Sequence, residues 1–414
     1  MRIIVEEMPY MKSVSIVIGI GVGSRYEEKK YQGISHLVEH MLFKGTGNRE
    51  NTLELSKVVE GIGGAINAST SEENTLLYVK VPQKVFVTAF DVLADIILNS
   101  LMRNDDLQRE KNVVIEEIRK CKDTPEELVG LLLDKIMWKN HPLGRGILGD
   151  EKSVKAISRE ILLSYVDKFY RPNNMVISIA GKVKTEEVIS KVKKYFGGME
   201  NKEIKEYLPV REKQEEYQIN IKSKKTNQAH LCFGFPTISR MHPDRYSVDL
   251  LDIILGSGLS SRLFQEIRVK RSMAYDVHSY VQYFNDIGSF NIYAGVDSDR
   301  LKESIKVILK ELKKIRENDM PEEELIKAKE MYKGALSLNL ESTLNQAFWL
   351  GNKLLLYGKP FTEDEVKKKI EKVEAKDVIQ SARKIFKKNG INLSIVGPFK
   401  EKDREELGAL FQEL

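Results

Sequence analysis

The sequence predicts an α+β fold made of two duplicated halves, each a mainly antiparallel sheet with helices largely on one face. The chain repeats itself, because residues 166–181 align without a gap on residues 382–397, at an offset of 216. Alternating apolar strands open each half, and an apolar strand closes it. Strands and helices do not alternate regularly, as they would around a parallel sheet. A period above 200 residues indicates a domain duplication, so we expect each half to form its own core.

The same offset relates segments outside this aligned pair. It places the alternating strand positions of residues 3–5 on residues 219–221. It also places the apolar face of a helix expected over residues 154–162 on residues 370–378. Three separate segments with one offset favour duplication over chance similarity.

A charged segment without periodic apolar residues separates the halves. Gly197 and Gly198 end a helix, and the stretch that follows is crowded with Lys and Glu. We therefore expect a first domain over residues 1–205, a linker over residues 206–216 and a homologous second domain over residues 217–414.

The composition excludes several classes of protein. Of the 414 residues, 42% are apolar and 31% are charged, so the chain can bury a large core and is not disordered. The net charge is only +5, which argues against a nucleic-acid partner. The apolar run over residues 14–22 is far shorter than the ~20 residues that cross a membrane, and it does not resemble a signal peptide. We expect a cytoplasmic protein without a membrane partner, and two cysteines fit a reducing compartment.

A helix expected over residues 34–42 carries the most specific motif. The run HLVEH places His36, Glu39 and His40 at positions i, i+3 and i+4, which share one helix face. Two imidazoles on adjacent turns suit zinc, and Glu39 is placed to take a proton from water activated by the ion. Histidines on an apolar helix can also be packed core residues. The chain has only six histidines, however, so this spaced triplet favours function.

A third zinc ligand is expected on another helix. The four remaining histidines occur singly, so a carboxylate is the better candidate. In the helix expected over residues 105–121, Glu110 and Glu117 recur on a half-apolar face, whereas Glu116 lies on a charged face. We assign Glu117 to the metal and Glu110 to a position that orients a ligand or the water. The alternative is that both are ordinary glutamates of a surface helix.

The order His-x-x-Glu-His is the inverse of the commoner zinc-protease motif and is the inverzincin signature. Here GSRYE precedes it at residues 23–27, FKGT follows at residues 43–46, and GGAINAST occupies residues 63–70. With these motifs the chain resembles the pitrilysin and insulysin family of zinc metallopeptidases, most of all its short branch related to the mitochondrial processing peptidase. In that family a glutamate follows the second histidine after 76 intervening residues, which matches Glu117 here. A further family glutamate, seven residues earlier, matches Glu110.

The resemblance implies roles for two residues of the second half. Arg268 and Tyr275, in the run SSRLFQEIRVKRSMAY, match an arginine and a tyrosine that face the metal from the opposing domain. Taken alone, these residues indicate no more than surface and packing. By resemblance, Tyr275 would donate a hydrogen bond to the oxyanion of the tetrahedral intermediate, and Arg268 would hold a substrate carbonyl or carboxylate. At the offset of 216, Asp252 and Gly256 replace the two histidines, so we expect no metal site in the second half.

The resemblance also implies a substrate strand and a partner chain. The residues that match the family's exposed edge strand, onto which a peptide adds as an extra strand, are Asn67, Ala68, Ser69 and Thr70. An ordinary polar hairpin is the alternative for this segment. In the short branch two chains pair around a chamber that limits substrate size. A homodimer would then bring Arg268 and Tyr275 across the interface to the partner's zinc.

We therefore expect a zinc-dependent endopeptidase, with one zinc per chain, that hydrolyses short or unfolded peptides inside a dimer chamber. One alternative is a non-catalytic structural or regulatory subunit of the same fold. That alternative predicts a broken metal set, whereas the expected zinc ligands and Glu39 are all present. Another is an active subunit that needs a different, inactive chain to supply its arginine and tyrosine. The presence of both Arg268 and Tyr275 favours the homodimer.

Overall fold

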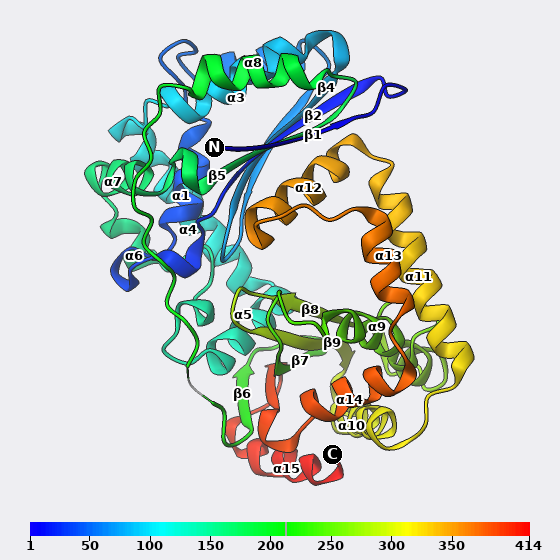
Figure 1. Cartoon of the computed structure of the whole chain (residues 1–414). Helices are drawn as coiled ribbons and strands as arrows, with labels where there is room; N and C mark the ends of the chain where they lie inside the picture. Colours follow the sequence, from blue (N-terminus) through cyan, green and yellow to red (C-terminus); the bar gives the residue numbers. More distant parts are fainter. Residues whose placement is uncertain (212) are drawn as a thin grey trace. The chain divides into compact units, whose positions relative to one another are not determined.

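The computed structural model describes residues 1–211 and 213–414. Residue 212, in the linker expected over residues 206–216, lies outside the described residues. The chain packs into two compact units, each built on one five-stranded sheet (Figure 1). Unit 1 consists of Met1–Arg119, Arg145–Leu208 and Ser337–Phe361. Unit 2 consists of Lys120–Gly144, Pro209–Leu336 and Thr362–Leu414.

The sheet of unit 1 has the strand order β1-β5-β2-β4-β3. Its strands are β1 (Arg2–Glu7), β2 (Ser13–Ile20), β3 (Ala65–Thr70), β4 (Thr75–Pro82) and β5 (Met175–Gly181). The β1–β5 pair is parallel, and the other three pairs are antiparallel. Strand β3 therefore lies at one edge of the sheet.

The main core of unit 1 lies on one face of this sheet. Ile16 and Ile18 of β2 are buried there in one cluster with Leu37 and Met41. Complete burial of such a side chain contributes about 1.5–3 kcal/mol. The first-half helices in unit 1 are α1 (Ile34–Leu42), α2 (Thr52–Glu60), α3 (Phe86–Asn99), α4 (Asn104–Asp123), α6 (Glu151–Ala156), α7 (Arg159–Phe169) and α8 (Thr185–Phe196). The last residues of α4 belong to unit 2.

The opposite face of the same sheet is covered by α12 (Thr343–Tyr357), a helix from the second half of the sequence (Figure 1). Val17 faces this side because side chains alternate along β2, and it packs with Ala347. A Cβ atom added to Gly351 would lie 3.0 Å from the Cβ of Ser178, so helix and sheet approach closely there.

The sheet of unit 2 repeats this topology, with the order β6-β10-β7-β9-β8. Its strands are β6 (Gln218–Ser223), β7 (Gln228–Thr237), β8 (Ala274–Tyr283), β9 (Gly288–Asp297) and β10 (Asn392–Gly397). Again the outermost pair, β6–β10, is parallel and the others are antiparallel. The bounds of β6 are those of β1 moved by 216 residues, as the repeat predicts.

A first-half helix covers one face of the second sheet. Helix α5 (Pro125–Met137) packs Leu133 and Met137 in one cluster with Cys232 and Val396. On the other face the ring of Phe235 meets that of Phe386 at 5.1 Å between centroids. The other helices assigned to unit 2 are α9 (Arg245–Leu255), a π-helical segment (Phe264–Val269), α10 (Leu301–Glu317), α11 (Glu322–Leu340), α13 (Glu363–Glu371), α14 (Ala375–Ile385) and α15 (Arg404–Ala409). The last residues of α11 belong to unit 1.

The two halves thus exchange corresponding helices. Moving α5 by 216 residues gives residues 341–353, which overlap α12. The α+β class and the duplication are confirmed, and the structure adds one exchanged helix on the second face of each sheet. The expected domain boundaries follow the repeat along the sequence and stay a prediction.

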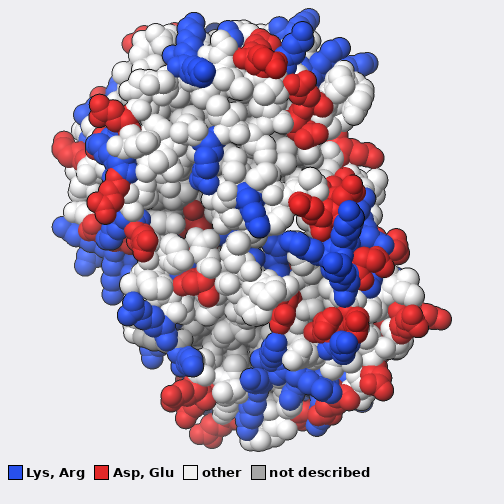
Figure 2. Space-filling model, in the orientation of Figure 1, with Lys and Arg blue, Asp and Glu red and all other residues white. Residues whose placement is uncertain are grey.

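Basic and acidic side chains are interspersed on the face of the molecule drawn in Figure 2. No helix in the described part of the chain combines the length and the apolar character needed to span a bilayer.

Candidate metal centre

Helix α1 separates an apolar side from a polar side. Leu37, Val38 and Met41 are fully buried in the core of unit 1. The histidines and the glutamate of the HLVEH run lie on the other side and are partly exposed. This division follows from the 3.6-residue period, because apolar residues on one stripe anchor the helix and leave the polar stripe for chemistry.

The three expected ligands converge. Nε2 of His36 and Nε2 of His40 each lie 3.7 Å from Oε2 of Glu117. One ligand atom from each residue lies within 4.8 Å of the others. A tetrahedral zinc with bonds of about 2.1 Å separates its ligand atoms by about 3.4 Å. The donor set, two nitrogens and one carboxylate oxygen, therefore fits zinc in both chemistry and spacing.

The protonation of His36 favours metal binding. Burial, together with the neighbouring His40, lowers the pKa of His36 to about 4, so the ring is neutral at pH 7. Its Nδ1 atom is buried and has no hydrogen-bond partner among the described residues. The nitrogen that faces Glu117 is Nε2.

Glu110 fixes the orientation of the His40 ring. Its Nδ1 atom lies 2.9 Å from Oε2 of Glu110, whose Oε1 lies 2.8 Å from Nζ of Lys44. Burial opposes protonation of His40, but Glu110 and the charge of Glu117 outweigh it and raise the pKa of the ring. Burial would raise the pKa of Glu110, yet His40 and Lys44 hold it below its ordinary value. A charged Glu110 keeps the proton on Nδ1 and leaves Nε2 for a metal.

Glu39 is held by the last residue of the edge strand. The hydroxyl of Thr70 donates a hydrogen bond of 2.5 Å to Oε2 of Glu39. Burial raises the pKa of Glu39, while the bond from Thr70 opposes this shift. A carboxylate whose pKa moves toward neutrality is suited to act as a general base.

The remaining residues expected in the substrate strand lie in β3. Asn67 and Ser69 are exposed, whereas Ala68 is buried, as strand alternation requires. Because β3 is an edge strand, its outer backbone groups are not used by the sheet. Binding of a substrate here stays a prediction.

Arg268 and Tyr275 come together in unit 2. The guanidinium of Arg268 lies 5.0 Å from the centroid of the Phe264 ring and 4.8 Å from that of Tyr275. Both residues line a hollow of about 480 Å³ together with Gln228 and Asp297, among others. Tyr275 is 75% exposed. Their role toward the metal stays a prediction.

In the second half, Asp252 and Gly256 correspond to the two histidines, and close packing leaves no room there for a larger side chain at Gly256. A Cβ atom added to Gly256 would lie 2.3 Å from the backbone nitrogen of Ser279, and Asp252 accepts a hydrogen bond of 2.5 Å from the Ser279 hydroxyl. Among the described residues, the His36–His40–Glu117 cluster is the one group of three or more His, Cys, Asp or Glu side chains that could hold a metal ion.

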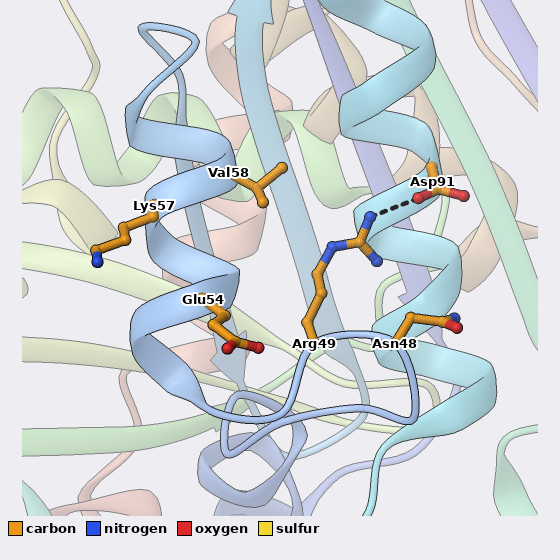
Figure 3. Close-up of a pocket in the computed structure, with 6 residues that line it drawn as sticks. All are labelled: Asn48, Arg49, Glu54, Lys57, Val58 and Asp91. Atoms are coloured by element: carbon orange, nitrogen blue, oxygen red, sulfur yellow. Dashed lines mark hydrogen bonds and ion pairs between the residues drawn. The ribbon is translucent and has the colours of Figure 1, made fainter.

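The loop after α1 is fastened to α3. Arg49 pairs with Asp91 and with Asp95 at 2.5 Å, and the hydroxyl of Thr46 donates to Asp95. Figure 3 shows Arg49 reaching toward Asp91. Both residues line a hollow of about 650 Å³, together with Glu54 among others. These contacts hold residues 46–49 of the loop that follows α1 against α3.

Sequence reasoning missed the contacts that support the cluster. Lys44 belongs to the FKGT segment, which carried the family resemblance but suggested no role for the lysine. Glu27, described below, belongs to the GSRYE segment and suggested none either. In the folded chain Lys44 contacts Glu110, and Glu27 contacts Ser35 beside His36. The only sequence signal for either residue was that its segment belongs to the family resemblance.

Comparisons with known proteins identify the family. Residues 2–151 match the insulinase family (peptidase family M16), and residues 156–332 match the peptidase M16 inactive domain. The chain is 37% identical to "Uncharacterized zinc protease YmxG" of Bacillus subtilis over 96% of both chains. It is 35% identical to an "Uncharacterized zinc protease" of Rickettsia felis, over 96% of this chain and 95% of that one.

Solved structures share the fold. A protease from Helicobacter pylori superposes with a TM-score of 0.90 at 23% identity, over 96% of both chains. A peptidase M16 inactive domain from Pseudomonas fluorescens superposes with a TM-score of 0.86 at 20% identity, again over 96% of both. With its two halves matched in order and relatives aligned over nearly the whole length, the chain belongs to the M16 (insulinase) family of peptidases.

Proposed function

We propose that this chain is a zinc-dependent endopeptidase that hydrolyses short or unfolded peptides. The observation that carries the proposal is the convergence of His36, His40 and Glu117 on one point beside Glu39. Glu39 is close enough for the charges of His40 and Glu117 to act on its pKa. The names of the relatives, zinc proteases, support the same activity.

The residues divide the chemistry among them. One zinc per chain, held by the three ligands, would supply a Lewis acid that polarises the scissile carbonyl and lowers the pKa of water. Glu39 takes the proton of the attacking water and delivers it to the leaving amine. Thr70 fixes the carboxylate of Glu39, and Glu110 fixes the ring of His40.

The edge strand accounts for the substrate class. A peptide that adds to β3 as an extra strand pairs through its backbone, which fixes an extended chain but reads little of its sequence. Such pairing requires a peptide without competing structure of its own. Asn67 and Ser69 are exposed on the strand and would contact the peptide's neighbouring side chains.

Two further groups would act from the second half. Arg268 has no carboxylate partner among the described residues, and its two aromatic neighbours hold it in place. It can therefore bind a substrate carbonyl or carboxylate, while the exposed Tyr275 donates a hydrogen bond to the oxyanion. We assign both to the partner's site in a homodimer whose chamber limits substrate size. The free cysteines, Cys121 and Cys232, fit a cytoplasmic location.

A non-catalytic subunit is the second candidate, because residues 156–332 match the M16 inactive domain. Digestion of unstructured peptides by the purified protein decides between the two. The proposal predicts hydrolysis that a chelator abolishes and zinc restores, little cleavage of folded proteins, and elution at twice the chain mass of 47.4 kDa. Absence of hydrolysis by the zinc-loaded protein would instead support the non-catalytic subunit.

A further inference from the structure

A buried carboxylate outside the proposed chemistry holds the start of α1. Glu27 is only 6% exposed. Its Oε2 accepts a hydrogen bond of 2.7 Å from the backbone N–H of Gly33, and its Oε1 accepts one of 2.8 Å from the N–H of Ser35. Both oxygens of the carboxylate are therefore committed to the first turn of the helix that carries the histidines.

The helix has no cap of its own at this end. The residue at the N-cap position is Gly33, which has no side chain to accept from the first-turn N–H groups. These donors face the protein interior, where unsatisfied N–H groups are costly. A carboxylate there also meets the positive end of the helix dipole. Glu27 thus replaces the usual N-cap residue from six positions upstream.

Surrounding contacts fix this cap in place. A guanidinium N–H of Arg145 donates to the backbone carbonyl of Glu27 at 3.2 Å. The hydroxyl of Ser35 lies 2.7 Å from that of Tyr165. Gly33 has φ +90°, and a Cβ added there would lie 2.5 Å from the carbonyl oxygen of Leu148. The first turn of α1 is therefore clamped by three separate segments of unit 1.

Ser35 directly precedes His36, so the clamp acts one residue from a zinc ligand. The Nε2 atoms of the two histidines meet Glu117, which lies on a different helix, α4. A shift or rotation of α1 by about 1 Å would separate donor atoms that must be held within about 0.5 Å. The ion pairs of Arg49 fasten the loop that follows α1 to α3, and Glu27 holds the N-terminal end of α1.

We propose that Glu27 is a positioning residue for the metal centre: it caps α1 and so sets the histidines against Glu117 before the metal binds. This inference rests on the proposed function, since it takes zinc as the ion that the three ligands hold. If Glu27 has this role, its substitution weakens zinc binding by more than a loss of stability of the same size elsewhere in the chain does.

The test compares Glu27→Gln and Glu27→Ala with a matched control, Thr362→Ala. Thr362 caps α13, a helix of nine residues like α1, by accepting from the N–H of Glu365 at 3.1 Å. Three quantities are measured for each zinc-free protein: melting temperature, hydrogen exchange of the α1 amides, and the zinc dissociation constant by competition with a chromophoric chelator.

Glu27→Ala is expected to weaken zinc binding by about 10–100-fold and to expose the amides of Gly33 and Ser35 to exchange. Glu27→Gln, whose amide oxygen still accepts one bond, is expected to fall between Glu27→Ala and the wild type. Thr362→Ala should lower the melting temperature and leave zinc affinity unchanged. Zinc affinities of both Glu27 variants equal to that of the wild type would overturn the positioning role alone. Failure of the wild type to bind zinc would contradict the proposed function itself.

Discussion

His40 and Glu110 lie 2.9 Å apart, between Nδ1 of the ring and Oε2 of the carboxylate. This bond turns Nε2 of His40 toward Glu117. The pair links α1 to α4 and joins a candidate metal ligand to Glu110, which lies outside the candidate ligand set. Its loss should therefore change metal affinity with little effect on the fold.

Glu110→Ala is expected to weaken zinc binding by about 10–100-fold, because the ring of His40 loses the partner that fixes its orientation. The zinc dissociation constant of the apoprotein measures the effect. Glu116→Ala is the matched control, since Glu116 lies on the same helix with its side chain 69% exposed. Equal losses of affinity in both variants would show that Glu110 has no special place in the site.

Glu39→Gln is expected to retain zinc and to lose hydrolysis by at least about 100-fold, because an amide cannot take the proton of the attacking water. Zinc analysis and initial rates on an unstructured peptide measure the two effects separately. A Glu39→Gln protein that still cleaves peptides at the wild-type rate would remove Glu39 from the mechanism.

Co-expression of Glu39→Gln chains with Tyr275→Phe chains tests the proposed action across a dimer. Each single variant should be nearly inactive, since loss of one oxyanion donor costs about 100-fold or more. If Tyr275 serves the partner's zinc, a mixed dimer contains one intact site. Random pairing then restores about a quarter of the wild-type activity. Activity no higher than the sum of the two inactive homodimers would refute the crossed arrangement.

Gly351→Val tests the exchanged helix α12. A side chain at Gly351 collides with Ser178 on the sheet, so the free energy of unfolding should fall by about 1–3 kcal/mol. Gly334→Val provides the control, because a Cβ there meets nothing within 4 Å. Thermal melting of both proteins gives the comparison, and equal stabilities would mean that α12 does not pack on the sheet as described.

Glu27 should make a contribution to the stability of the protein that falls as the pH rises toward neutrality. Burial raises the pKa of Glu27 to about 7, although Ser35, Gly33 and Arg145 favour its charged form. Between the ordinary carboxyl pKa and pH 7 the folded protein binds one proton more than the unfolded chain. The contribution is thus fully present below about pH 4.5 and is lost through pH 7, on the order of 3 kcal/mol.

Urea unfolding at several pH values measures this change, with Glu27→Gln as the comparison. The variant has no proton to lose at this position, so the free energy of unfolding of the wild type should fall relative to that of the variant between pH 4.5 and 7. Identical pH profiles for the two proteins would show that Glu27 keeps its ordinary pKa when folded.

Much of the fold can be predicted from the sequence, because the two halves of the sequence align at a constant offset. The strand pattern at residues 3–5 recurs at residues 219–221, and the structure places β1 and β6 at equivalent positions beside β5 and β10. The helix exchange could not be predicted. An amphipathic pattern in α5 or α12 indicates that one face is buried, but it does not indicate which sheet covers that face.

The candidate site likewise contains residues that the sequence predicts and residues that it does not. Helical spacing selects His36 and His40, because residues one turn apart share a face. The face that Glu117 shares with Glu110, together with the family's spacing from the second histidine, selects Glu117, and the structure brings these three together. Their roles stay predictions. Lys44 and Glu27 escaped sequence reasoning for a physical reason: each acts through a contact made only in the folded chain, and neither lies in a local capping or ligand motif.

The most direct measurement is the zinc content of the purified protein and of its His40→Ala and Glu117→Ala variants, determined by atomic emission after dialysis against a weak chelator. We predict one zinc per chain in the wild type and almost none in either variant, with all three proteins folded. Zinc retained in the variants at the wild-type ratio would contradict the account, because the ion would then be held elsewhere.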